Sequence, residues 1–204
     1  MMFNHLKVIV HTKRGRGTGQ KSNHIINQPF IKEIIEFPVL KVNGETFNVE
    51  STFHQYVEPQ VHKELSSFCT ELTGITQDMV NGQPQITETL EKFKRWMKSE
   101  GLLEPSVTSV FVTFGDWDLK TMLPSESKHF GFSYADYLKH WINIKKPYNE
   151  VMGAYPKDMM VTLEGMKLKH EGRHHSGIDD CKNIANILRQ LALRGHVFKE
   201  TGSL

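Results

Sequence analysis

The pattern of hydrophobic and polar positions predicts a group of strands in the first part of the chain. Residues 6–10 read as a short strand, and residues 31–42 and 46–57 read as two more. Asn43 and Gly44 lie between the latter two, and because both residue types tolerate positive φ they predict a two-residue hairpin turn. Residues 11–29 are rich in Gly, Lys, Arg, Ser and Asn and have no periodicity, which predicts a loop.

Helical spacing dominates the remainder. Thr87 is suited to cap a helix that Gly101 ends, and Thr76 is suited to cap a shorter one. Residues 107–114 read as a buried strand followed by a helix, and residues 133–170 as mostly helical with a strand at 141–144. A last helix spans about residues 178–194. Early strands followed by alternating strands and helices predict an α/β domain with a mixed sheet flanked by helices.

The last helix carries the most informative polar residue. Asp180 precedes Ile184, Ile187 and Leu191 at helical spacing, so it lies on their apolar face, whereas Asp179 and Asn183 fall on the polar side. A carboxylate on a buried face is costly unless it is paired or bound to a cation.

His175 lies five residues before Asp180 in a loop between glycines, an arrangement suited to acid–base chemistry. The alternative is purely structural. Asp179 would be the helix N-cap and Asp180 a first-turn acid, both stabilised by the helix dipole.

A second polar group, Asp116-Trp117-Asp118, lies where the strand at 107–114 gives way to a helix. Ligands gather at such strand ends in open α/β sheets, and Asp118 directly precedes the helical positions. The two acids are equally suited to capping the helix. Trp117 either packs or provides a surface for stacking a nucleobase. In a third segment, residues 68–76, Phe68 and Leu72 would ordinarily belong to a core.

Bulk properties narrow the class of protein. The 204 residues suit one domain, and no apolar run approaches the length of a membrane span. The start of the chain does not read as a signal peptide, and two cysteines suggest a reducing compartment. We therefore expect an intracellular protein, cytoplasmic, nuclear or both.

Basic side chains gather at the start of the chain. Residues 1–32 hold six of them and no acid: Lys7, Lys13, Arg14, Arg16, Lys21 and Lys32. They suit an arm that contacts phosphates, although a solvated loop would have the same composition.

Five stretches, in this order and with these gaps, resemble the DEDDh exonucleases, and more narrowly the third subgroup of the Eri-like exoribonucleases. The stretches are residues 30–38, 68–76, 115–118, 141–146 and 172–187. The resemblance covers about residues 30–200. It implies a ribonuclease H-like fold, hydrolysis of RNA from the 3′ end, and two Mg²⁺ or Mn²⁺ ions held by four carboxylates.

The resemblance also implies roles for individual residues. Asp118 and Asp180 match metal ligands, and His175 matches the general base that activates water. Phe68 and Trp117 match the two rings that hold the 3′-terminal base of the RNA. The turn from Leu72 to Thr76 matches the segment against the terminal nucleotide, which makes both of these residues candidate RNA contacts.

The chain departs from the family at its first motif, an Asp-x-Glu on the first strand. His11 and Lys13 stand where those acids are expected, and the first acid of any kind is Glu33. The remaining carboxylates would bind divalent ions weakly, and Lys13 would repel a second cation. Replacement of these acids by Glu33 or Glu36 is not expected, because both lie on the next strand.

We therefore divide the chain into a divergent basic segment at residues 1–29 and an exonuclease domain at residues 30–204. Either residues 1–29 are a variant or mis-assembled N-terminus, so that the family's enzyme is active but this chain is not, or the chain is a silent RNA-binding or scaffold module. A DNA-directed enzyme of the same family is a third hypothesis, against which the Eri-like stretches argue. The sequence does not identify protein partners.

Overall fold

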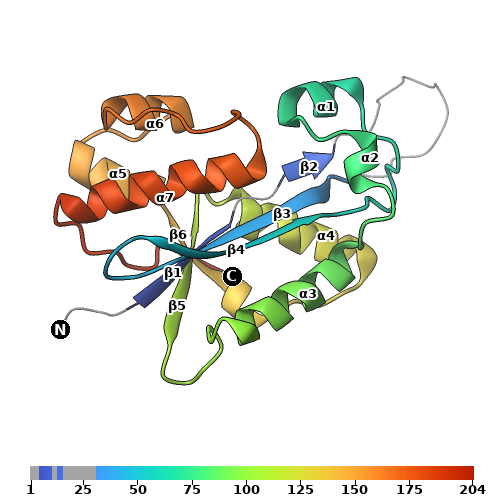
Figure 1. Ribbon diagram of the computed structural model, residues 1–204, viewed down its shortest axis with the longest axis horizontal. Coiled ribbons are helices and arrows are strands. Elements are labelled where there is room, and N and C mark those ends of the chain that lie inside the picture. The colour runs from blue at the N-terminus through green and yellow to red at the C-terminus, as the bar shows by residue number, and fades with distance from the viewer. Residues whose placement is uncertain (1–4, 11–12, 16–30) are drawn as a thin grey trace.

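A mixed seven-stranded sheet forms the centre of the fold (Figure 1). The computed structural model describes residues 5–10, 13–15 and 31–204, with side chains from residue 31 onward. The first predicted strand is β1 (His5–Val10), which pairs antiparallel with β3 (Glu33–Val42) and parallel with β5 (Thr108–Thr113). Strand β1 therefore lies inside the sheet, although the division of the chain at residue 29 stays a prediction.

The other strands extend the sheet on both sides. Strand β2 (Lys13–Gly15) and strand β4 (Val49–Tyr56) pair antiparallel with β3. Strand β6 (His140–Asn143) pairs parallel with β5 and antiparallel with β7 (Gly202–Ser203). The predicted mixed sheet is confirmed.

Two predictions about loops are wrong. Residues 13–15 belong to a strand, because their backbone pairs with β3. The turn between β3 and β4 spans residues 43–48, because the Asn43 side chain accepts hydrogen bonds from the backbone nitrogens of Glu45 and Thr46. The residue with positive φ in this turn is Phe47, at 57°.

Helices cover both faces of the sheet and one end of it. Helices α3 (Ile86–Ser99) and α4 (Leu123–Phe130) lie on one face, and α5 (Lys145–Met152), α6 (Met159–Gly165) and α7 (Gly177–Leu193) lie on the other (Figure 1). Helices α1 (Ser67–Thr73) and α2 (Gln77–Val80) lie at the end near β2 (Figure 1). A π-helix, η1 (Asp118–Met122), leads into α4, and a 3₁₀-helix, η2 (Asp136–Lys139), leads into β6.

The sequence predicts the N-cap of one helix correctly and that of another helix wrongly. Thr76 is the N-cap of α2, as predicted. Helix α3 begins at Ile86 with Gln85 as its N-cap, so the prediction that Thr87 caps it is wrong. Fully buried Ile86 begins the apolar face of α3, which therefore extends one position before Thr87.

The burial of strand β3 reflects the helices that cover both faces of the sheet. Residues 33–40 of this strand are all buried, which is typical of a strand between two layers of helices. Phe37 and Val39 pack with Phe93 of α3, whereas Leu40 and Val42 pack with residues of α7 such as Ile184. In the part of the chain that the structure describes, no helix has the length and apolar character needed to cross a membrane.

Candidate active site

Asp180 lies in the first turn of α7 and is 2% exposed. Ile184, Ile187 and Leu191 are fully buried on the same helix, so the predicted inward face is confirmed. Asn183, which we expected on the polar side, is also fully buried because its amide binds the backbone of Glu171 at both nitrogen and oxygen.

The beginning of α7 is held by a carboxylate from the sheet. Glu36 of β3, which is 1% exposed, accepts hydrogen bonds from the backbone nitrogens of Gly177 and Ile178 at 2.9 and 3.2 Å. Its Oε1 atom also lies 2.9 Å from Nε2 of His54. An anion at a helix N-terminus satisfies free N–H groups and interacts favourably with the helix dipole.

The prediction that Asp179 is an N-cap is wrong, because Ser176 holds that position. Asp179 accepts hydrogen bonds from the backbone nitrogen of Arg173 and from Lys182. Burial raises the pKa of Asp179, but the hydrogen bonds from Lys182 and Arg173 outweigh it and hold the pKa below its usual value. Asp179 therefore fixes the loop that precedes the helix.

That loop carries His175, whose φ is 68°. A positive φ is uncommon for a residue with a side chain, and such backbone strain clusters at functional sites. The ring of His175 lies 3.8 Å from that of His174, and Nδ1 of His174 lies 4.0 Å from Oδ1 of Asp180. Through His174, the structure brings the predicted base and the predicted metal ligand Asp180 into one cluster.

Asp118 is the first residue of η1 and is 3% exposed. The loop before it is tied to the neighbouring strand, because Asp116 accepts hydrogen bonds from Nε1 of Trp141 and Nδ2 of Asn143. Asp116 thus fixes the loop to β6, while Asp118 is a buried acid at the end of β5. Its role as a metal ligand stays a prediction.

Asp118 and Asp180 offer the oxygen donors that Mg²⁺ and Mn²⁺ prefer. The carboxylate of Glu36 binds α7 and His54, and that of Glu33 accepts hydrogen bonds from the backbone nitrogens of residues 60–62. These two acids are therefore engaged in structural contacts and are poor replacements for the first motif. Residue 11 and the side chain of Lys13 lie outside the described part of the chain.

The candidate RNA contacts are exposed. Phe68 and Leu72 lie one turn apart on α1, with exposed fractions of 50% and 39%, so their assignment to a core is wrong. Thr76 is also exposed. Trp117 is 44% exposed, and Nζ of Lys32 lies 4.9 Å from its ring centre.

A pocket of about 600 Å³ opens beside Trp117. Its lining combines the indole ring with basic side chains: Lys32, Lys128 and His129. Aromatic rings beside cationic groups are typical of surfaces that bind single-stranded nucleic acid.

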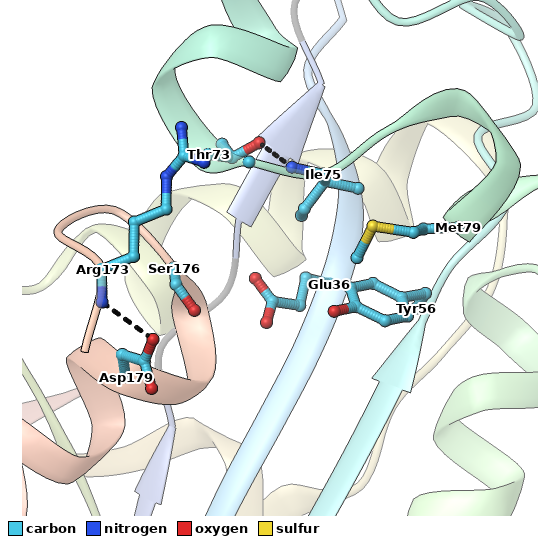
Figure 2. Close-up of a pocket in the computed structure, with 9 residues that line it drawn as sticks. Glu36, Tyr56, Thr73, Ile75, Met79, Arg173, Ser176 and Asp179 are labelled. Carbon is cyan, nitrogen blue, oxygen red and sulfur yellow. Dashed lines mark hydrogen bonds between the residues drawn. The ribbon is translucent and has the colours of Figure 1, made fainter.

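A second pocket, of about 180 Å³, lies between the turn after α1 and the beginning of α7. Figure 2 shows Glu36 in this pocket between Ser176 and Asp179 on one side and Tyr56 on the other. Burial, followed by the negative charges of Glu36 and Asp179, raises the pKa of Tyr56, so its phenol stays protonated at neutral pH.

The residues that organise this pocket were missed from the sequence. Arg173 reaches across to α1, and a Cβ added to Gly74 would meet its Nη1 atom at 2.6 Å. In the sequence, the only signals for the role of this loop are Gly172 and the positive charge of Arg173 next to the two histidines. Glu36 had a stronger signal, since it is an acid within a run of apolar residues.

A family model described as an exonuclease, of the RNase T type, matches residues 26–188. ERI1 exoribonuclease 3 of Homo sapiens is 58% identical over 171 residues, which are 83% of this chain and 51% of that protein. The chain therefore spans about half the length of the curated relatives it matches.

Solved structures agree in fold. The nuclease domain of 3′hExo, a DEDDh family member bound to rAMP, has a TM-score of 0.89 and 32% identity, and the match covers 99% of this chain and 98% of that one. A 3′-exonuclease structure that concerns 3′-end recognition of a histone mRNA stem-loop has a TM-score of 0.85 and 31% identity, over 99% and 92% of the two chains. The ribonuclease H-like fold is thus confirmed. The chain belongs to the DEDDh 3′-5′ exonucleases, among the Eri-like exoribonucleases.

Proposed function

We propose that this chain is a metal-dependent 3′-5′ exoribonuclease domain whose hydrolytic activity is impaired by the absence of the first Asp-x-Glu motif. One observation carries the proposal. Buried Asp180 lies within 4.0 Å of His174, whose ring lies against that of His175, at the beginning of α7. A buried acid beside imidazole rings in a strained loop suits proton transfer near a bound cation.

Hydrolysis of the last phosphodiester gives each group a task. The oxygen of a water forms a bond to phosphorus, and the bond from phosphorus to the O3′ atom of the preceding nucleotide breaks. His175 would accept the proton that the water loses, and O3′ would gain a proton as it leaves. Imidazole suits the first step because it exchanges a proton near neutral pH.

Asp118 and Asp180 would hold the divalent ions, which when bound stabilise negative charge on the attacking and leaving oxygens. Both carboxylates are almost fully buried, at 3% and 2% exposed. Divalent ions are general among the DEDDh enzymes, and Mg²⁺ or Mn²⁺ suits an oxygen ligand set.

Phe68, Leu72, Thr76 and Trp117 would bind the RNA. Half-exposed rings such as Phe68 and Trp117 can stack on any base, which suits an enzyme that removes nucleotides regardless of sequence. Lys32, beside Trp117, would attract phosphate. The relative with a similar fold that recognises the 3′ end of a stem-loop supports RNA 3′ ends as the ligand.

Impairment follows from charge. The printed sequence has no Asp before Asp78 and no acid before Glu33, so two of the four expected ligands are lacking. The backbone of Lys13 lies opposite Glu36 in the sheet, and it is Glu36 that binds the beginning of α7. A lysine at the place of a metal ligand would repel the second cation.

A silent RNA-binding module is the second candidate. The exposure of Phe68 and Trp117 favours it, because stacking on a 3′-terminal base requires these rings but no metal.

The test is a gel assay on 5′-labelled single-stranded RNA with Mg²⁺ or Mn²⁺. The parent chain is compared with the double variant His11→Asp, Lys13→Glu, and with the same double variant carrying Asp180→Asn. We expect little or no cleavage by the parent, a ladder that shortens from the 3′ end with the double variant, and no ladder once Asp180 is replaced. Anisotropy of the same RNA measures binding in parallel.

The outcomes separate the candidates. A double variant that binds RNA without cleaving it would support the silent module, and faster cleavage of a matched DNA oligonucleotide would identify a DNA-directed enzyme. Cleavage by the double variant that the added Asp180→Asn leaves unchanged would refute the proposed site.

A further inference from the structure

Three metal-ligating side chains meet beside the beginning of α7: His170, His174 and Asp180. Each offers one ligand atom, and these atoms all lie within 4.8 Å of one another. Within the part of the chain that the structure describes, the buried Nε2 atom of His170 and the buried Nδ1 atom of His174 have no hydrogen-bond partner. Buried polar atoms are almost always satisfied by a protein group, a water or an ion, so these two nitrogens point to a ligand.

The backbone around the two histidines is fixed before any ion binds. Glu171, next to His170, is bound to Asn183 through both its backbone nitrogen and its backbone oxygen, at 3.0 and 2.9 Å. Its side chain also accepts a hydrogen bond from Asn186. Arg173, next to His174, donates its backbone N–H to Asp179 at 3.0 Å.

Close packing at Gly172 tightens the same segment, because a Cβ there would lie 2.2 Å from Cγ of Asp179. The segment is therefore anchored to α7 on both sides of Gly172, and only the two rings remain to be oriented. Such anchoring of ligand residues lowers the cost of binding an ion.

We propose that His170, His174 and Asp180 form a site for one zinc ion, which shares Asp180 with the Mg²⁺ or Mn²⁺ site and adds two histidines to it. Two imidazoles and one carboxylate suit Zn²⁺, whereas Mg²⁺ prefers oxygen ligands alone. Ligand atoms around tetrahedral zinc lie about 3.3 Å apart. The separation of 4.0 Å between Nδ1 of His174 and Oδ1 of Asp180 therefore has to shorten on zinc binding, and no pair of ligand atoms starts more than 4.8 Å apart.

The site has a consequence for the proposed exonuclease. Because Asp180 belongs to both ligand sets, zinc would compete with the divalent ions that support hydrolysis and would draw His174 away from the ring of His175. This consequence rests on the proposed function, but zinc binding itself does not.

The test uses the whole chain, freed of metal with a chelator and titrated with Zn²⁺ against a chromophoric chelator. We expect one zinc ion per chain and a dissociation constant at least ten-fold higher in His170→Gln and in His174→Gln. His140→Asn, at an exposed histidine of β6, and Asp118→Asn should leave the dissociation constant unchanged. Equal affinity in the parent and both histidine variants would overturn the proposal.

X-ray absorption of the zinc-loaded parent gives a second reading that needs no variant. Two imidazole nitrogens with oxygen ligands are expected, and sulfur or all-oxygen coordination would refute the site. Both measurements are made without RNA, so a chain that fails to cleave RNA can still pass them. Conversely, RNA cleavage by the restored double variant without zinc binding would leave the proposed function intact and refute the zinc site.

Discussion

Arg173 donates a hydrogen bond of 2.6 Å from its Nη2 atom to the backbone oxygen of Glu71. The bond joins the loop before α7 to helix α1, two segments 102 residues apart in the chain. Gly74, with a φ of 78°, leaves the space through which the guanidinium reaches α1. The loop that holds His175 and the helix that presents Phe68 are thereby held in one arrangement.

Replacing Arg173 with alanine should loosen α1. A hydrogen bond from a charged donor contributes about 1.5–3 kcal/mol. We therefore expect amide hydrogen exchange in α1 to accelerate about ten-fold or more, and the affinity for a short RNA to fall with it, because Phe68 is no longer held in place. Hydrogen exchange followed by mass spectrometry, together with RNA anisotropy, measures both.

Arg189→Ala is the matched control, since it removes the same charge from an exposed position of α7. If both variants weaken RNA binding equally while α1 stays protected, net charge and not the bond to Glu71 is responsible.

Glu36→Gln should destabilise the fold without changing divalent metal affinity. Glu36 accepts hydrogen bonds from Gly177 and Ile178 at the positive end of α7, and an amide supplies one acceptor and no charge. A loss of about 1–3 kcal/mol in the free energy of unfolding is expected from urea titration. Glu45→Gln, at an exposed residue of the β3–β4 turn, should change it by less than about 0.5 kcal/mol. A specific loss of Mn²⁺ affinity in Glu36→Gln would instead make this acid a metal ligand.

The local parts of this site could be predicted from the sequence. Helical spacing alone places Asp180 on the buried face, because the positions of Ile184 and Ile187 follow from the geometry of a single helix. The resemblance to a family adds Asp118 and His175, whose roles as metal ligand and general base stay predictions. Spacing also predicts that Phe68 and Leu72 share one face of α1, but it cannot tell whether that face meets a core or solvent.

The contacts between distant segments could not be predicted. Glu36 binds Gly177, 141 residues away, and Arg173 binds a backbone oxygen whose residue type is irrelevant to the bond. Neither contact produces a periodic pattern of residues in the sequence. The prediction of a two-residue turn between β3 and β4 failed for a local reason. The Asn43 side chain accepts hydrogen bonds from the backbone nitrogens of Glu45 and Thr46, and these bonds stabilise a longer loop than the Asn-Gly pair indicates.

Alanine at Phe68 or Trp117 should weaken RNA binding more than it weakens the fold. Both rings are about half exposed, so each contributes little to the core, whereas stacking on a base is worth about 1–3 kcal/mol. We expect the dissociation constant for a short single-stranded RNA to rise about five-fold or more in each variant, with the urea midpoint nearly unchanged.

Tyr155→Ala controls for the loss of an exposed ring, because Tyr155 is 58% exposed in the loop between α5 and α6. A large fall in stability for Phe68→Ala or Trp117→Ala would identify these rings as packing residues. An equal rise of the RNA dissociation constant in Tyr155→Ala would show that the loss of RNA affinity is not specific to them.

Glu126 gives the fold a pH dependence of its own. Burial raises the pKa of this carboxyl in α4 from 4.5 to about 8, while its oxygens accept a hydrogen bond from the backbone nitrogen of Ile34. Between these two pH values the folded chain keeps a proton that the unfolded chain has released. This group therefore makes the free energy of unfolding fall as pH rises from 4.5 towards 8, by up to about 1.4 kcal/mol per pH unit.

Glu126→Gln removes the titrating group but keeps an oxygen for Ile34. We expect the variant to match the parent near pH 5 and to be more stable than the parent by about 2 kcal/mol or more at pH 8, in urea titrations at pH 5, 6.5 and 8. Glu104→Gln, at an exposed acid, should run parallel to the parent across this range. If the parent and Glu126→Gln lose stability with the same slope, Glu126 is already ionised in the folded chain. The hydrogen bond from Ile34 would then outweigh the cost of burying its charge.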